Sequence, residues 1–222
     1  MVKPPEPRWH ASIVVLLTIL LYVTLPSKLT LGPVWAFPLV VLVLLVPLSI
    51  FAPYRRVESP LQRGTSIVLI AIVNLFNVAS VIELIFDLVF RGGKGALSGQ
   101  HLLLAGGQIW LTNILVFSLW YWELDGGGPQ VRDGARSENE LAKADFLFTA
   151  MLADYRKSAL IDPAWKPMLL DYLYLAFTNA LAFSPTDTFP MTGMAKVLMM
   201  AEAVISFVTM AVVVSRAVNI IS

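Results

Sequence analysis

The sequence predicts an all-α integral membrane protein with about five transmembrane helices and one re-entrant pore helix. Three observations predict this fold class: an apolar composition, five apolar segments near the length that crosses a bilayer, and a sixth that is too short to cross. Of 222 residues, 57% are hydrophobic and only 14% are charged, and the mean hydropathy is +0.74. About 20 apolar residues are needed for one helical crossing of the hydrocarbon core.

The composition also excludes several classes of function. The net charge is +1 and no basic face stands out, so a nucleic-acid partner is not expected. The chain has no cysteine, which rules out disulfides, a thiolate nucleophile and a cysteine-based metal site, and which suits a bacterial inner membrane. His10 and His101 lie at the edges of apolar segments without metal-ligand spacing. The sequence therefore predicts no enzyme site, no metal and no cofactor.

Residues 1–98 are predicted to form a region of three spans. The first span covers about Ala11–Leu31, the second about Pro33–Ala52, and the third about Thr65–Phe90. The start of the chain has charge before an apolar run, as a signal peptide does. However, Leu25–Lys28 reads Leu-Pro-Ser-Lys, which is a poor site for cleavage after small residues, so we expect the first span to be retained.

Residues 99–222 are predicted to form a second region, which begins with a fourth span at about Leu102–Leu124. This span ends in Trp-Tyr-Trp, an aromatic belt typical of a membrane interface. A polar or interfacial insertion follows over residues 125–166, opened by three glycines and a proline that break the helix. Within it, Asp145–Ala159 carries apolar and aromatic residues that favour a helix lying on the bilayer surface.

Two apolar segments complete the second region. Met168–Leu181 follows Pro167, is too short to span, and ends just before a Ser-Pro break. Met194–Ile221 is long enough to be the fifth span. A short apolar helix, an irregular segment and then a full span are the layout of a re-entrant pore helix, because irregular backbone at membrane depth needs cover from protein or a water-filled cavity. The alternative for Met168–Leu181 is an ordinary amphipathic surface segment.

Tyr172–Ile221 resembles the pore of the tetrameric potassium-channel superfamily. The channel pattern reads Y-F-x-F-x-T-x-T-T-V-G-Y-G-D-x-x-P-x-T, followed by an apolar inner helix with L-E-A near its start. This chain reads Y-L-Y-L-A-F-T-N-A-L-A-F-S-P-T-D over Tyr172–Asp187. When the two are matched from Tyr174, the channel's T-V-G-Y-G-D falls on Ala182–Asp187, with Pro190 and Thr192 in step. The resemblance implies a homotetramer in which the fourth span is the outer helix, Met168–Leu181 the pore helix and the last span the inner helix.

The filter itself departs from the channel pattern. Both glycines are replaced, by Ser184 and Thr186, and the tyrosine is replaced by Pro185, so the backbone that aligns a stack of carbonyl rings is not expected. Potassium selectivity of the usual kind is therefore not predicted. A ring of Asp187 carboxylates would attract cations to a polar mouth, whereas the alternative for Asp187 is a cap or turn residue before the last helix. The filter-equivalent positions are Thr178, Asn179, Ala182, Phe183, Ser184, Pro185, Thr186 and Asp187.

The last span offers four candidates for pore lining: Glu202, Ser206, Met210 and Val214. The last three recur at intervals of four, which places them on one face of a helix. Packing against neighbouring helices is the alternative. Glu202 lies inside an apolar run, where an ionisable group is costly and so indicates a function or a buried partner. Many bacterial channels of the family carry a glutamate there, so it is also interpretable as a scaffold residue bonded to the pore helix.

The third span carries a polar stripe at intervals of three and four, formed by Asn74, Asn77, Ser80, Glu83 and Asp87, of which Asn74, Asn77, Glu83 and Asp87 are the intramembrane polar candidates. One interpretation is an ion or proton relay in a carrier. The other is hydrogen bonding between helices, with Asp87 paired to Arg91 one turn on. Gln108, Thr112 and Asn113 in the fourth span support the second interpretation.

Two rules for membrane orientation disagree. The channel register places the filter side outside, so that Arg91 and Lys94 are cytoplasmic and the amino terminus is not. The positive-inside rule favours the reverse, because Arg55, Arg56 and Arg63 would then lie in the cytoplasm. We expect the cluster of three arginines to be cytoplasmic.

The sequence thus predicts a channel-like membrane protein, a homotetramer in the lipid bilayer, with inorganic ions as candidate ligands. No span carries the repeated arginines of a voltage sensor. Two alternatives stay open. One is a secondary or proton-coupled transporter that uses intramembrane carboxylates, and the other is a non-conducting structural protein on a channel scaffold.

Overall fold

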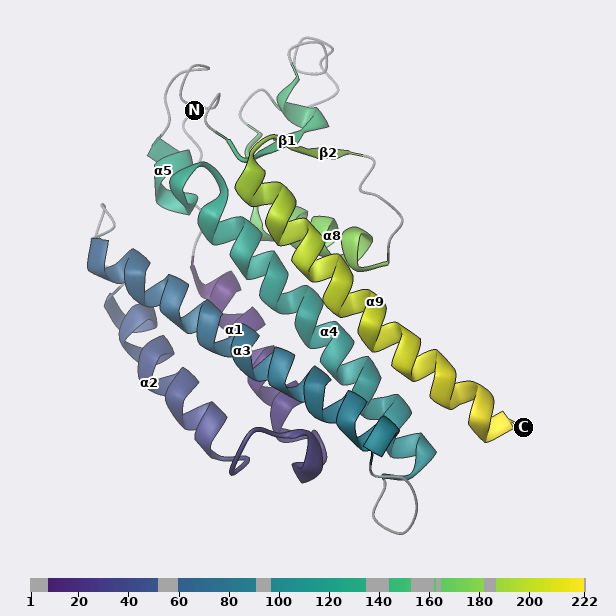
Figure 1. Cartoon of the computed structure of the whole chain (residues 1–222). Coiled ribbons are helices and arrows are strands. Elements are labelled where there is room, and N and C mark those ends of the chain that lie inside the picture. The colour runs from purple at the N-terminus through teal and green to yellow at the C-terminus, as the bar shows by residue number, and fades with distance from the viewer. Residues whose placement is uncertain are drawn as a thin grey trace.

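Long helices that pack around one central helix make up most of the structure, a computed structural model (Figure 1). The described residues are 8–51, 60–90, 97–134, 144–152, 162, 165–181 and 187–221. The helices are α1 (Trp9–Val23), α2 (Ala36–Phe51), α3 (Pro60–Phe90), α4 (Gly99–Leu124), α5 (Pro129–Gly134), α8 (Leu169–Ala180) and α9 (Gly193–Ile221). Short 3₁₀ turns cover Ser27–Leu29, Asp125–Gly127 and Thr149–Met151, and the strands are β1 (Phe146–Phe148) and β2 (Thr188–Pro190).

Three helices of the described part, α3, α4 and α9, are long and apolar enough to cross a membrane, which is compatible with a membrane protein. The predicted third, fourth and fifth spans correspond to them. The first two predicted spans are shorter helices, because α1 has 15 residues and α2 has 16. The first apolar segment does not stay helical to Leu31: α1 ends at Val23, and Pro26 precedes a 3₁₀ turn.

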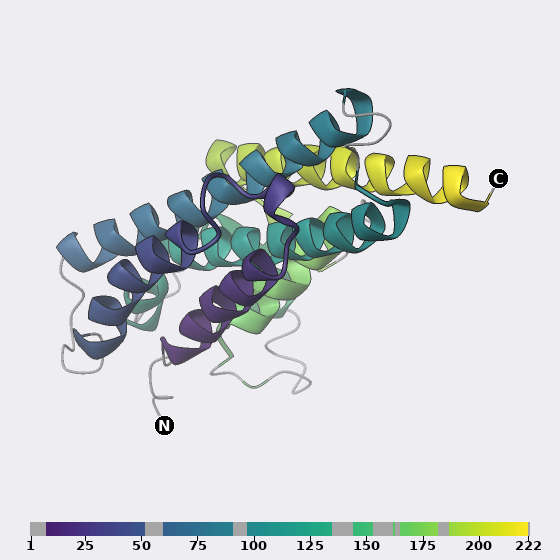
Figure 2. The ribbon, with the colours of Figure 1, turned by 90° about the horizontal axis from the view of Figure 1, so that it is seen from below.

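Helix α4 forms the centre of the bundle. It packs against α1, α3, α8 and α9, and Figure 2 shows it between α9 on one side and α1 and α8 on the other. In the apolar stretch of α4, 67% of the residues are buried, whereas in that of α9 the share is 17%. Helix α9 is therefore much less buried within the chain than α4 is.

The turn between α1 and α2 is fixed by an aromatic cluster. The ring of Tyr22 lies 4.2 Å from that of Phe37 and 5.7 Å from that of Phe76 on α3. The hydroxyl of Tyr22 accepts a hydrogen bond from the Leu31 backbone N–H at 2.9 Å. This cluster holds the short helices α1 and α2 against α3.

A two-stranded sheet replaces part of the interfacial helix predicted over Asp145–Ala159. Strand β1 pairs antiparallel with β2, with Leu147 opposite Phe189. Phe146 and Phe148 alternate into the core, where their rings lie 5.0 Å from Tyr121 and 5.4 Å from Tyr172. The helix prediction was wrong here because a period of two at Phe146 and Phe148 was read as part of a longer helical pattern.

Gly106 on α4 lies directly against α9. A Cβ atom at this position would lie 2.3 Å from Cγ2 of Val213, whereas a Cβ at neighbouring Gly107 would meet nothing within 4 Å. Val213 is β-branched and therefore stiff within a helix. The absence of a side chain at Gly106 is thus a condition of the α4–α9 packing.

We expect Gly106→Ala to lower the free energy of unfolding by roughly 1–3 kcal/mol, the usual cost of overpacking a core. Gly107→Ala is the matched control and should be neutral or stabilising by up to about 1 kcal/mol, since alanine is the better helix former. Thermal unfolding of the purified protein in detergent measures both. Adding Val213→Ala to Gly106→Ala should restore stability, and a failure to do so would contradict the assigned contact.

Candidate functional site

The short helix predicted over Met168–Leu181 is confirmed as α8, whereas its re-entry into a membrane stays a prediction. Its start is capped by Asp171, whose Oδ2 accepts a hydrogen bond from the Met168 N–H at 2.7 Å. One face is buried, and it carries Leu169, Tyr172, Leu175, Ala176 and Ala180. The opposite face leaves Leu170, Tyr174 and Phe177 exposed.

Glu202 joins α8 to α4 and α9. The Tyr121 hydroxyl on α4 donates to its Oε2 at 2.5 Å, and the Asn179 amide on α8 donates to the same atom at 2.7 Å. Asn179 also donates to the Met199 carbonyl at 2.9 Å. Glu202 is 0% exposed. The last turn of α8 is therefore fixed to α9 at the predicted intramembrane carboxyl.

A second set of polar contacts lies next to Glu202 and joins α3, α4 and α9. The Asn77 amide donates to Oδ1 of Asn113 at 3.3 Å. The Asn113 amide donates to Oγ of Ser206 at 2.9 Å and to the Glu202 carbonyl at 3.3 Å. We call Asn77, Asn113, Glu202 and Ser206 the polar seam. Its contacts are hydrogen bonds between helices, in agreement with the second interpretation of the polar residues on α3.

The four pore-lining candidates on α9 do not share one environment. Glu202 and Ser206 are buried against α4 within the chain, both with 0% exposure. Met210 is 36% and Val214 is 55% exposed. In a single chain, only the latter two face a surface that a pore or another chain would meet.

The remaining candidates on α3 lie farther from the seam. Asp87 is buried, and its Oδ2 accepts a hydrogen bond from the Leu97 N–H at 3.1 Å, which ties the end of α3 to the start of α4. Glu83 and Asn74 are half-buried. The predicted partner of Asp87, Arg91, lies outside the described residues.

The filter-equivalent residues are described only at the two ends of the segment. Ala182, Phe183, Ser184, Pro185 and Thr186 lie outside the described residues. On one side, the Thr178 hydroxyl donates to the Tyr174 carbonyl at 2.9 Å and so turns back onto α8.

On the other side of that segment, Asp187 is half-buried just before β2. Its carbonyl accepts a hydrogen bond from the Thr149 N–H at 2.8 Å, and its carboxylate accepts one from the Thr188 hydroxyl at 3.2 Å. The N-cap of α9 is Thr192, whose hydroxyl accepts a hydrogen bond from the Ala195 N–H at 3.2 Å. Asp187 therefore does not cap that helix.

Sequence reasoning missed the carboxylate that organises this end of the bundle, Asp125. It is fully buried, and its Oδ1 accepts hydrogen bonds from the Asp145 N–H at 2.6 Å and the Phe146 N–H at 3.1 Å. Its Oδ2 accepts one from the Tyr172 hydroxyl on α8. Asp125 thus joins the end of α4 to β1 and α8.

Asp145 extends this connection to α9. Its Oδ2 accepts a hydrogen bond from the Gly126 N–H at 3.1 Å, and its Oδ1 accepts one from the Thr192 hydroxyl at 2.6 Å. The sharp turn between α4 and α5 depends on Gly126, Gly127 and Gly128, which all have positive φ. In the sequence, Asp125 stands directly before three glycines, and this pattern predicted only a break in the helix.

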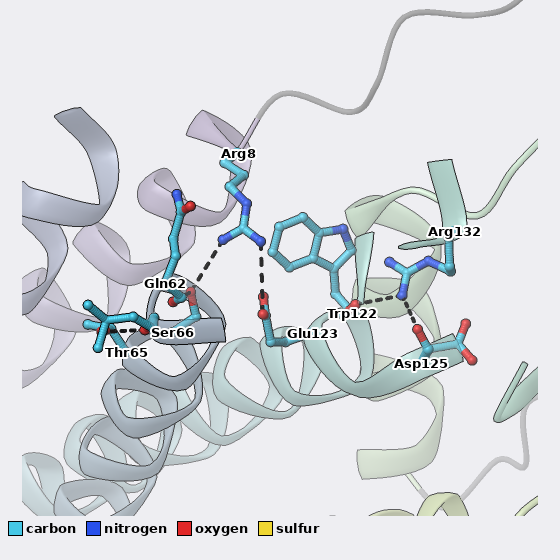
Figure 3. A network of polar contacts seen from close by, with 9 residues as sticks. Arg8, Gln62, Thr65, Ser66, Trp122, Glu123, Asp125 and Arg132 are labelled. Atoms are coloured by element: carbon cyan, nitrogen blue, oxygen red, sulfur yellow. Dashed lines mark hydrogen bonds and ion pairs between the residues drawn. The ribbon is translucent and has the colours of Figure 1, made fainter. Parts of the chain in front are cut away.

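Arginines gather around the same end of α4 (Figure 3). Arg8 donates to Oγ of Ser66 at 3.3 Å and lies 3.9 Å from the buried Glu123 carboxylate. Burial lowers the pKa of the Arg8 guanidinium, and Glu123 opposes that shift. Arg132 donates to the carbonyls of Trp122 at 2.8 Å and Asp125 at 2.5 Å. These contacts bring the starts of α1 and α3 to the end of α4.

The positions of the lysines and arginines bear on the disagreement between the positive-inside rule and the channel register. One end of the bundle carries the end of α4 together with the starts of α1, α3, α8 and α9 (Figure 1). Most lysines and arginines with described side chains lie at that end: Arg8, Arg63, Arg132, Lys166 and Lys196. Lys28 lies beyond the far end of α1. The positive-inside rule therefore places the start of α8 on the cytoplasmic side, opposite to the channel register.

No protein-family model, characterised protein or solved structure matches this chain.

We expect Asp125→Ala to destabilise the protein by roughly 3 kcal/mol or more, because three donors lose a charged, buried acceptor. Asp162→Ala removes the same charge from an exposed position at the same end and should change stability by less than about 0.5 kcal/mol. Thermal unfolding in detergent measures both variants. Equal effects would contradict the assigned role of Asp125.

The orientation is testable because the chain has no cysteine to interfere. We expect a cysteine introduced at exposed Asp162 to react with an impermeant maleimide only when the cytoplasmic face is opened. A cysteine at exposed Lys28 should react in intact cells. The reverse labelling of the two positions would show that the channel register holds instead.

Proposed function

We propose that this chain is a channel-like membrane protein that acts as a homotetramer and passes cations without the usual potassium selectivity. The observation that carries the proposal is the hydrogen bonding of Glu202 to Tyr121 and Asn179. These hydrogen bonds hold α8 between the long apolar helices α4 and α9. The filter-equivalent positions begin in the last turn of α8 and continue after it. This is the order of outer helix, pore helix, filter and inner helix that the resemblance implies.

The path of the chain around α8 supports re-entry. Near its start, α8 bonds to Asp125 at the end of α4, and near its other end Asn179 bonds to Met199 and Glu202, well inside α9. The chain is back beside β1 at Asp187. A segment that enters a bundle and returns to the same end, between two helices long enough to span, has the geometry of a re-entrant helix.

The exposed face of α8 supports assembly. Tyr174 and Phe177 match aromatic positions of the channel pattern, and they are 48% and 44% exposed in the single chain. Together with the largely exposed helix α9, they form an apolar surface that further copies would cover in a tetramer. Helices α1, α2 and α3 would then form the N-terminal three-span region, which packs against α4 through α1 and α3.

The altered filter determines what such a channel selects. Ser184, Pro185 and Thr186 stand where the potassium filter needs two glycines and a tyrosine. A wider polar mouth leaves ions partly hydrated, so discrimination between sodium and potassium is weak. Four copies of Asp187 near this mouth would favour cations over anions.

A carboxylate-based transporter is the second candidate, and one observation favours it. Glu202 is a fully buried member of the polar seam, so a single chain already contains an ionisable group in its interior. Asp87, however, bonds to the backbone of Leu97 and is thereby engaged at the far end of the bundle. Transport by this route would not need four copies of the chain.

The test combines a subunit count with an ion flux. We expect native mass measurement in lipid nanodiscs to give four copies, and proteoliposomes to pass sodium and potassium at similar rates. Asp187→Asn should lower the cation flux by roughly tenfold at low ionic strength, because the ring of charge no longer concentrates cations. The reduction should shrink at high salt, where charge is screened.

Asp162→Asn is the control, since it removes an equal charge from an exposed position outside the filter-equivalent segment. It should leave the flux unchanged. Tetramers without flux would favour a non-conducting scaffold. Monomers or dimers with a saturable, proton-dependent flux would favour the transporter.

A further inference from the structure

The Glu202 carboxyl group has an unbalanced environment. Its Oε2 accepts two hydrogen bonds, whereas its Oε1 is buried and has no hydrogen-bond partner among the described residues. No lysine, arginine or histidine of the described residues forms an ion pair with it. Burying a carboxylate without a counter-charge is strongly unfavourable.

Within the part of the chain that the structure describes, the groups that face Glu202 from neighbouring helices do not supply a positive charge. From α4 the facing titratable group is Tyr121, which is neutral when it donates its proton. From α8 the facing group is the neutral amide of Asn179. From α3 the nearest part of the seam is the neutral amide of Asn77, which reaches Glu202 only through Asn113.

Glu123 provides an internal comparison. It lies on α4, is likewise buried with 1% exposure, and has the Arg8 guanidinium 3.9 Å away. Among the described residues, a counter-charge therefore lies beside one buried glutamate and none lies beside the other. This difference points to a bound positive charge at Glu202 that no described side chain supplies.

We propose that Glu202 is a binding site for a single positive charge, either a proton or a monovalent cation, held at Oε1. The bound charge stabilises the contact of α8 with α4 and α9. Glu202 lies on α9, and its other oxygen, Oε2, accepts hydrogen bonds from Tyr121 on α4 and Asn179 on α8. The site lies within one chain, so it exists whether or not four copies assemble around a pore. Removal of the charge leaves a bare carboxylate in the bundle and loosens α8 next to the filter-equivalent segment.

The experiment compares wild-type protein with Glu202→Gln in detergent. Glutamine keeps an oxygen that accepts from Tyr121 and Asn179 and carries no charge. Melting temperatures are recorded from about pH 5 to about pH 9, in sodium, potassium or choline chloride at equal ionic strength. We expect the wild-type melting temperature to fall as the pH rises in choline, and the Glu202→Gln curve to lack that fall.

The three salts distinguish the two sources of charge. A melting temperature that falls equally in all three salts as the pH rises identifies a bound proton. A fall in choline that sodium or potassium reverses, in wild type but not in Glu202→Gln, identifies a cation. Glu123→Gln should lower the melting temperature throughout yet keep the wild-type dependence on pH and salt. Identical dependence in wild type and Glu202→Gln would overturn the proposal.

Infrared spectroscopy of the wild-type protein keeps the proposal testable if Glu202→Gln does not fold. A bound proton gives the carbonyl stretching band of a protonated carboxyl group near neutral pH, and that band disappears as the pH rises. A bound cation gives no such band but shifts the carboxylate bands when sodium replaces choline. Absence of both signals would overturn the proposal.

Discussion

The buried carboxylate of Asp125 determines how this end of the bundle is arranged. It accepts hydrogen bonds from the backbone of β1 and from the hydroxyl of Tyr172, so the end of α4, the sheet and α8 share one acceptor. Asp145 then carries the connection to Thr192 at the start of α9. Because buried donors and acceptors must be paired, these segments are positioned by hydrogen bonds at least as much as by apolar contact. The start of α8 and the start of α9 are thereby fixed relative to each other.

The same constraint acts inside the bundle. Helices with apolar surfaces gain little from contact with one another in lipid, so close packing and hydrogen bonds must hold them. Gly106 allows α4 and α9 to approach closely, and Asn113 bonds across to both α3 and α9. Glu202 then holds the last turn of α8. Asn77, Asn113 and Ser206 are thus explained as ties between helices, whereas the buried Oε1 of Glu202 has no hydrogen-bond partner among the described residues.

The long helices and α8 were predictable because each is a run of apolar residues between clear breaks. The end of α1 was not, since Thr24 and Leu25 continue the apolar run, and it is the contacts of Tyr22 that shape the following turn. Strand β1 is only three residues long, and its partner lies some 40 residues away, so no local pattern specifies the pairing. Similarly, nothing in the sequence indicated that Asp125 would be buried. Glu202 was identified because an acidic residue within an apolar run is rare, but its partners Tyr121 and Asn179 come from separate segments.

The positions that match the channel pattern fall into two groups, which differ in what they explain. Thr192 has a structural role within the chain, because it caps α9 and donates a hydrogen bond to Asp145. The fold alone therefore accounts for a threonine at this position. Tyr174 and Phe177 lie on the exposed face of α8, where nearly half of each side chain is exposed, and the Phe177 ring also lies 6.2 Å from the ring of Trp110 on α4. Exposed aromatic side chains add little to the stability of a single chain. In the tetramer proposed above, another copy would cover these side chains, so assembly is the property on which the proposed pore depends.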